Sequence, residues 1–248
     1  MKNNKGKIDE NIGYYMLFVF TVIILLFQKY LNATLFLLFG VICWVYIYQK
    51  MKKRFSKKFI ILRLWILSIP LSFINVFGSS YGELPISWFN IFFIIIVLKF
   101  ICKYLLKGRM YLNSSSIISL FLIGISIIPL LRSLNFQDGL KQYINICISF
   151  IIMFMATNID KELTDLDKQQ LILDYISSTK IAAFGVVIQI FFIQGLRKNI
   201  GIYSLYANNR AAYSYLFSDV SFLSLFLSSG AMLVYFVKKD YFNSKLKW

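Results

Sequence analysis

The stretch "ISWFNIFFIIIVLKFICKYLL", residues Ile86–Leu106, decides the fold class because almost every position in it is apolar. It has the length of a helix that crosses a bilayer core of about 30 Å. Blocks of this kind recur along a chain of 248 residues that is 58% hydrophobic, 18% aromatic and only 15% charged. A soluble domain of this length would need a more polar surface. We therefore predict an all-α, polytopic integral membrane protein.

The apolar blocks predict about eight transmembrane helices, which form a single helical domain over residues 1–248. The expected spans are Gly13–Phe27, Leu31–Tyr48, Phe59–Phe77, Ile86–Leu106, Ile117–Leu131, Leu140–Thr157, Ser177–Leu196 and Leu216–Val237. The first two follow each other so closely that we expect them to form a tight helical hairpin.

The distribution of lysine and arginine predicts the orientation of these spans. If the N-terminus is cytoplasmic, the inner side receives the dense run "QKMKKRFSKK", residues 49–58, and most of the other basic residues. The outer side then holds only Lys29, Arg132, Lys141, Arg197, Lys198 and Arg210. We therefore expect a multi-pass protein of the cell membrane (plasma or inner membrane) with both termini in the cytoplasm.

Composition also excludes several classes of function. The net charge of +16 would suit a nucleic-acid partner, but topology explains these charges in short loops, so we expect no nucleic acid. The chain has no histidine, which excludes an imidazole base or a histidine-containing metal site. Cys43, Cys102 and Cys147 lie inside apolar spans and are odd in number, so a disulfide framework is not expected.

One inner loop is acidic instead of basic. The segment "NIDKELTDLDKQQLILDY", residues 158–175, carries five acidic residues and two lysines. Thr164 and Asp167 have the spacing of a helix-capping pair. We interpret the segment as a short amphipathic helix at the cytoplasmic surface. The spans themselves hold few charges, and Arg63 and Lys180 are close enough to inner span ends for their charged groups to reach the interface.

Three places on the outer side carry arginine beside the end of a span: Arg132, the pair Arg197 and Lys198, and Arg210. An arginine at a helix end can reach lipid headgroups at little cost, and this explanation stays open for each of them. Guanidinium groups also bind phosphate through two parallel hydrogen bonds. Three such places on one side of the membrane suit an anionic ligand.

Aromatic and acidic residues accompany Arg210. The tyrosines near it are Tyr203, Tyr206, Tyr213 and Tyr215. They offer stacking surfaces and hydroxyls that suit sugars, although tyrosine also populates ordinary interfacial belts. Asp219, at the start of the last span, either complements the helix dipole or orients an arginine or an acceptor hydroxyl. A phosphate ligand with a carbohydrate body would fit this vestibule.

The last span has small residues on one helix face. They are Ser218, Ser221, Ser224, Ser228 and Ala231, which recur at steps of three or four residues. Small and hydroxylated residues let membrane helices approach one another closely. We therefore expect this face to pack against another helix.

The stretch that begins at Arg210 resembles a motif of the O-antigen polymerase and ligase superfamily. Arg210, Ala211 and Ala212 precede "YSYLFSDVSFLS" at the outer entrance of a late span. Family members have a basic, aromatic outer loop followed by a phenylalanine, a small residue, and an acid or a proline. At this point the chain reads Asp–Val–Ser–Phe. Many members have an acidic residue, then proline, then serine or asparagine, then phenylalanine. The motif covers some 20 residues, and a looser likeness in hydropathy covers the whole chain.

The resemblance implies a glycosyltransferase that polymerises polyprenyl-pyrophosphate-linked oligosaccharides at the outer membrane face, in capsule, exopolysaccharide or O-antigen synthesis. The implied partners are that lipid-linked substrate, the lipid bilayer and other polysaccharide-assembly membrane proteins. No metal or other cofactor is expected. The candidate substrate-binding residues are Arg210, Arg132, Arg197, Lys198, Tyr213 and Asp219. The resemblance assigns no catalytic residue.

The sequence departs from this family in two ways that leave alternatives open. Members continue for several more spans, and the ligase branch carries a functional histidine that this chain lacks. We therefore expect an N-terminal portion of a longer polymerase, a truncated product or a divergent short member. A polysaccharide or lipid-linked-sugar transporter and a non-catalytic membrane subunit are the competing functions. A transporter should show polar residues near the membrane midplane, and only Arg63 and Lys180 approach that description.

Overall fold

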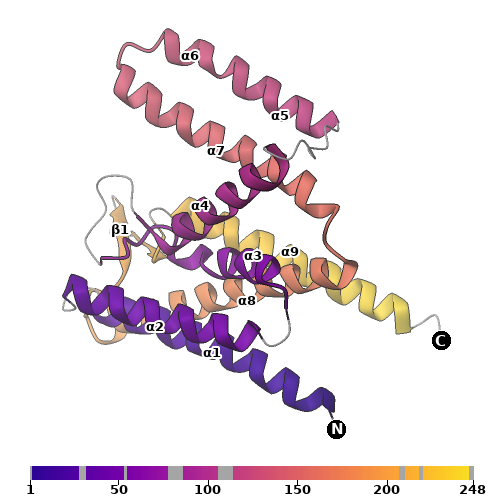
Figure 1. The fold of residues 1–248 in the computed structure, drawn as a ribbon. Helices are drawn as coiled ribbons and strands as arrows, with labels where there is room; N and C mark the ends of the chain where they lie inside the picture. Colours follow the sequence, from indigo (N-terminus) through magenta and orange to yellow (C-terminus); the bar gives the residue numbers. More distant parts are fainter. Residues whose placement is uncertain are drawn as a thin grey trace. The chain divides into compact units, whose positions relative to one another are not determined.

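The computed structural model describes residues 2–27, 32–52, 55–77, 86–105, 114–206, 210–217 and 220–245. It is mostly helical, as predicted, and Figure 1 shows the helices as long coiled ribbons. The α-helices are α1 Lys2–Phe27, α2 Ala33–Lys52, α3 Lys57–Leu67, α4 Trp88–Phe100, α5 Ser114–Ile125, α6 Ile127–Leu131, α7 Phe136–Asp160, α8 Asp165–Ile190 and α9 Val220–Lys245. A 3₁₀ turn covers Ile69–Leu71, and π-helical turns extend α4 and α8 over Ile101–Leu105 and Phe191–Gly195.

Four helical segments of the described chain are long and apolar enough to cross a membrane. They are Ala33–Lys52, Ser114–Leu131, Asp165–Gly195 and Val220–Val237. Two more apolar helices, Gly13–Phe27 and Ile146–Asp160, are shorter. Each of these segments overlaps one of the predicted spans. Their length and composition indicate a membrane protein.

The third predicted span is interrupted. Helix α3 ends at Leu67 and does not continue to Phe77, because Pro70 lacks the backbone N–H that the next helical turn would need. The Ser68 hydroxyl donates instead to the Trp65 carbonyl, at 2.7 Å. Ser68, Pro70 and Leu71 are buried, so the irregular backbone is covered by protein. Such backbone is tolerated at membrane depth only where protein or an aqueous cavity surrounds it.

The chain forms two compact units, residues 1–94 with 169–248 and residues 95–168. In the first unit, aromatic rings pack helices that are distant in sequence. The Phe18 and Phe184 rings join α1 to α8 at 6.4 Å between centroids, and the Tyr175 and Phe226 rings join α8 to α9 at 5.1 Å. Helix α8 therefore has neighbours on two sides and supports the other elements of this unit.

In the second unit, α5 and α6 run alongside α7 (Figure 1). The Ser116 and Thr157 hydroxyls are hydrogen-bonded across this helix pair at 3.0 Å. The Phe100 and Phe154 rings stack edge-on, with centroids 5.6 Å apart. Small polar contacts of this kind are a common means of joining helices where lipid replaces water.

The acidic segment is divided between the end of α7, at Asp160, and the beginning of α8, at Asp165, so the prediction of a separate surface helix is wrong. The helix starts at Asp165 and continues without a break to Ile190. The predicted capping pair is confirmed: the Asp167 N–H donates to the Thr164 hydroxyl at 3.2 Å, and the Thr164 N–H donates to the Asp167 carboxylate at 3.1 Å. No proline or glycine stands between Asp165 and the apolar part of the helix, so nothing ends it there.

Among the described residues, the serine face of α9 does not form the predicted close packing; Ser218, the first member of that face, lies outside the described residues. Ser221, Ser224 and Ser228 are exposed, as is Ala231. The buried face carries Leu223, Phe226 and Gly230 instead. Because Gly230 has no Cβ atom, the Thr179 side chain of α8 can approach the α9 backbone. A Cβ atom at this position would overlap the Thr179 side chain. The close approach thus uses the glycine and not the serines.

A β-hairpin lies between α8 and α9, which the all-α prediction missed. Strand β1 (Ile202–Tyr206) pairs antiparallel with β2 (Arg210–Tyr215). Tyr203 lies opposite Tyr213, and Tyr206 lies opposite Arg210. Tyrosine and isoleucine favour strands, and the two strands fall on either side of an asparagine-rich link. These local signals are present in the sequence, whereas the all-α prediction rested on the apolar segments alone.

Candidate functional site

The hairpin carries two of the predicted site residues, Arg210 and Tyr213. Arg210 is the first residue of β2 and therefore lies at the tip end of the hairpin. Tyr213 lies closer to the base, where its hydroxyl accepts a hydrogen bond from the Gln194 side chain at 2.9 Å. The strand pairing places the backbone of Arg210 opposite Tyr206.

Arg197 and Lys198 lie in the turn that links α8 to this hairpin. Both side chains are exposed. Arg197 has the left-handed backbone conformation, with φ 53°, and the Lys198 N–H donates to the Phe192 carbonyl at 2.9 Å. A left-handed residue is a common way to end a helix. The two cations are thus held at the same end of α8 as the hairpin.

The other two predicted residues are not part of the description of this group. Arg132 follows α6, is exposed, and belongs to the second compact unit. Asp219 lies outside the described residues. The group formed by Arg197, Lys198, Tyr213 and the strand position of Arg210 is called the hairpin site below.

The base of the hairpin is attached to α8 through Gln189. Its side-chain amide donates to the Ile200 carbonyl at 3.0 Å, just before β1, and its carbonyl accepts from the Tyr215 N–H at 2.8 Å, at the end of β2. The Tyr215 ring lies against α8 at Gly185, where a Cβ atom would overlap it. Burial raises the pKa of the Tyr215 phenol, so this ring stays neutral.

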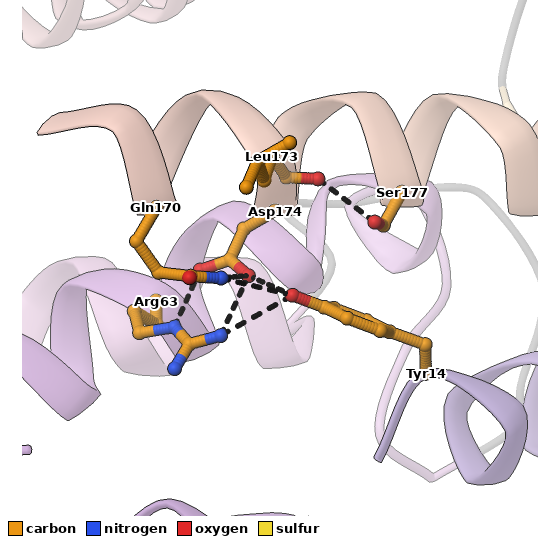
Figure 2. A network of polar contacts seen from close by, with 6 residues as sticks. All are labelled: Tyr14, Arg63, Gln170, Leu173, Asp174 and Ser177. Atoms are coloured by element: carbon orange, nitrogen blue, oxygen red, sulfur yellow. Dashed lines mark hydrogen bonds and ion pairs between the residues drawn. The ribbon is translucent and has the colours of Figure 1, made fainter. Parts of the chain in front are cut away.

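A second polar centre, which sequence reasoning missed, joins α3 to α8. Arg63 and Asp174 form a two-pronged ion pair (Figure 2): Nε lies 2.6 Å from Oδ2, and Nη2 lies 2.9 Å from Oδ1. The two side chains are 1% and 0% exposed. The prediction that Arg63 reaches the interface is therefore wrong, whereas Lys180 is exposed, as that prediction requires.

One further helix, α1, and a second residue of α8 supply polar groups to this pair (Figure 2). The Tyr14 hydroxyl of α1 donates to Asp174 Oδ1 at 2.6 Å and accepts from Arg63 Nη2 at 3.2 Å. Gln170, one turn before Asp174 on α8, donates to the Tyr14 hydroxyl at 3.2 Å. The guanidinium also lies 4.5 Å from the centroid of the Phe55 ring. Cation–π attraction adds to the ion pair there.

The two centres suit different tasks. The Arg63–Asp174 centre is buried and its charges neutralise each other, so it is built to hold α1, α3 and α8 in one arrangement. The hairpin site has exposed cations at Arg197 and Lys198, and exposed cations are available to an anionic ligand. Among the described residues, no group of three or more histidine, cysteine or acidic side chains is placed to hold a metal ion.

A partial signal for the buried centre is present in the sequence. An arginine in an apolar segment and an acidic residue in another apolar helix are expected to pair, because an isolated charge is costly there. Arg63 and Asp174 are 111 positions apart, and no local pattern connects them.

Comparison with known proteins does not place the chain in a family: no family model matches it, and no curated protein and no solved structure is significantly similar to it.

Proposed function

We propose that this protein is a multi-pass protein of the cell membrane that polymerises polyprenyl-pyrophosphate-linked oligosaccharides at the outer face. The observation that carries the proposal is the gathering of Arg197, Lys198 and the Arg210-bearing hairpin at one end of α8. The motif-like stretch that begins at Arg210 supplies the chemical class of the ligand. The four long apolar helices support membrane insertion.

In the proposed reaction, the anomeric carbon of the growing chain loses its bond to the lipid pyrophosphate and gains a bond to a hydroxyl oxygen of the next lipid-linked unit. The bonding electrons leave with the polyprenyl pyrophosphate, and the proton of the acceptor hydroxyl passes to the departing pyrophosphate or to water. The leaving group is already activated, so the protein needs mainly to position the acceptor and to stabilise the departing charge. Arg210 is proposed for the pyrophosphate, with Arg197 and Lys198 in support. Tyr213 would contact the sugar.

The remaining expectations belong to the same proposal. We propose about eight spans with both termini cytoplasmic, because this arrangement leaves the inner side basic and puts the hairpin site outside. Arg132 and Asp219 remain candidates for the same ligand. The proposed partners are the lipid-linked oligosaccharide, the bilayer and other proteins of polysaccharide assembly.

A transporter of the same ligand is the competing proposal, and the buried centre bears on it. A transport path needs polar groups that meet the cargo. The Arg63 and Asp174 side chains are at most 1% exposed and bind each other, so they give no support to such a path. The polymerase proposal is preferred for this reason.

The proposal is tested by deleting the gene for this chain in its own host and separating the polymer by length. We expect long polymer to disappear and single lipid-linked repeat units to accumulate, with recovery when the gene is restored. A transporter predicts accumulation of the same lipid-linked units, but on the cytoplasmic side of the membrane. Digestion of intact spheroplasts with a glycosidase that cannot cross the membrane separates the two outcomes.

A further inference from the structure

We infer that Gln189 positions the hairpin site by fixing both ends of the β-hairpin to α8, an inference that rests on the proposed function. Gln189 is buried near the end of α8. Its amide nitrogen and amide oxygen contact the two strands at the base of the hairpin: the nitrogen donates to the Ile200 carbonyl just before β1, and the oxygen accepts from the Tyr215 N–H at the end of β2. One side chain therefore attaches both strands to α8.

Burial makes this attachment difficult to release. The Gln189 and Tyr215 residues are fully buried and Ile200 is 8% exposed. If the hairpin tilted away, the Ile200 carbonyl and the Tyr215 N–H would lose their partner in a place that water does not reach. A buried polar group without a partner is costly. The hairpin base is therefore expected to keep one position.

Two glycines bring the backbone close enough for these contacts. Gly201 has φ +66°, a conformation that favours glycine. A Cβ atom there would lie 2.7 Å from the Tyr215 carbonyl oxygen and 2.8 Å from Gln189 Nε2. Gly185 leaves room for the Tyr215 ring on the surface of α8. The base of the hairpin is packed on both sides of Gln189.

The position of the base decides the position of the ligand-binding residues. Arg210 stands at the opposite end of β2 from Tyr215, and at 3.3 Å per residue this separation is about 16 Å. A tilt of roughly 10° at the base would move Arg210 by about 3 Å over that length. A misplacement of about 1 Å can reduce a rate by on the order of 10²-fold. Gln189 thus acts on the ligand through the hairpin, as a positioning residue.

The test compares Gln189→Met with a matched control in the full chain. Methionine keeps the length of the side chain and removes both hydrogen bonds. The control is Ser178→Ala, because Ser178 is also buried on α8 and its hydroxyl donates to the Tyr175 carbonyl of its own helix. Spin labels at Leu173 and Ala212, in a background without the native cysteines, report the distance between α8 and the hairpin. A polyprenyl pyrophosphate in detergent micelles is the binding probe.

We expect Gln189→Met to broaden the distance distribution and to weaken probe binding by about tenfold or more. The Ser178→Ala protein should keep a narrow distribution and normal binding. If Gln189→Met does not insert, Gln189→Glu, which keeps an acceptor for the Tyr215 N–H, takes its place. An unchanged, narrow distribution overturns the inference.

Polymer length separates this inference from the proposed function. If the distribution broadens but polymer length and probe binding stay normal, while Arg210→Ala abolishes polymer, the hairpin position does not matter and the inference is wrong. If Arg210→Ala itself leaves the polymer normal, the proposed function is wrong and the positioning role is lost with it. The spin-label distances still show in that case whether Gln189 holds the hairpin.

Discussion

Arg63 and Asp174 bind each other through two parallel hydrogen bonds although 111 positions separate them, and neither side chain is more than 1% exposed. The planar guanidinium suits a carboxylate in this geometry. Removing one partner of a buried ion pair leaves the other charge uncompensated. For this reason α3 and α8 must pack so that the Arg63 and Asp174 side chains stay paired.

We predict that Asp174→Asn lowers the free energy of unfolding by about 3–5 kcal/mol, the usual cost of breaking a buried ion pair from one side. The double variant Arg63→Met with Asp174→Leu should recover most of this loss, because it removes both charges. Thermal unfolding of the purified protein in detergent measures both effects. Equal stability of Asp174→Asn and the unaltered protein would contradict the role of the pair.

A second prediction concerns the orientation of α8. A cysteine at Asn199 should react with an impermeant reagent added to intact cells, and a cysteine at Asp165 should not. Both side chains are exposed; Asp165 is the first residue of the segment Asp165–Gly195 and Asn199 lies beyond its other end, so each is the control of the other. The native Cys43, Cys102 and Cys147 are replaced first. Reaction at Asp165 alone would reverse the topology and place the hairpin site inside the cell.

A third prediction separates ligand binding from membrane anchoring at Arg210. Arg210→Ala should shorten the polymer strongly without reducing the amount of protein in the membrane fraction. Arg210→Lys should recover only part of the length, because an ammonium keeps the charge and loses the two-pronged geometry. A headgroup anchor needs only charge, so full recovery by lysine and little effect of alanine would assign Arg210 to anchoring.

A fourth prediction uses two glycines as a matched pair. Gly230→Ala should destabilise the protein by about 1–3 kcal/mol, because the added methyl group would overlap the Thr179 side chain. Gly124→Ala should be neutral or slightly stabilising, since nothing lies within 4 Å of its Cβ position and alanine is the better helix former. The comparison is made by thermal unfolding in detergent. Equal effects would show that α8 and α9 do not pack closely at Gly230.

The helical class and several local details were predictable from sequence. The apolar segments depend on runs of neighbouring residues, and the cap at Thr164 and Asp167 depends on residues three positions apart. Within the candidate site, the same local information predicted Arg197, Lys198, Arg210 and Tyr213 as binding residues, and this stays a prediction. The attachment of the hairpin to the end of α8 could not be predicted, because it depends on the strand pairing and on the contacts of Gln189 with residues of other elements.

The sequence by itself determined that this protein is helical, apolar enough for a membrane, and capped at Thr164, because each of these properties depends on residues near one another in the chain. Only the tertiary structure decided that Arg63 pairs with Asp174, that Gln189 joins both ends of the hairpin, and that α9 packs through Gly230 and not its serines. These choices depend on which distant groups share a buried space. There, an unpartnered charge or amide is costly, so the partner that the fold supplies decides where each side chain can lie.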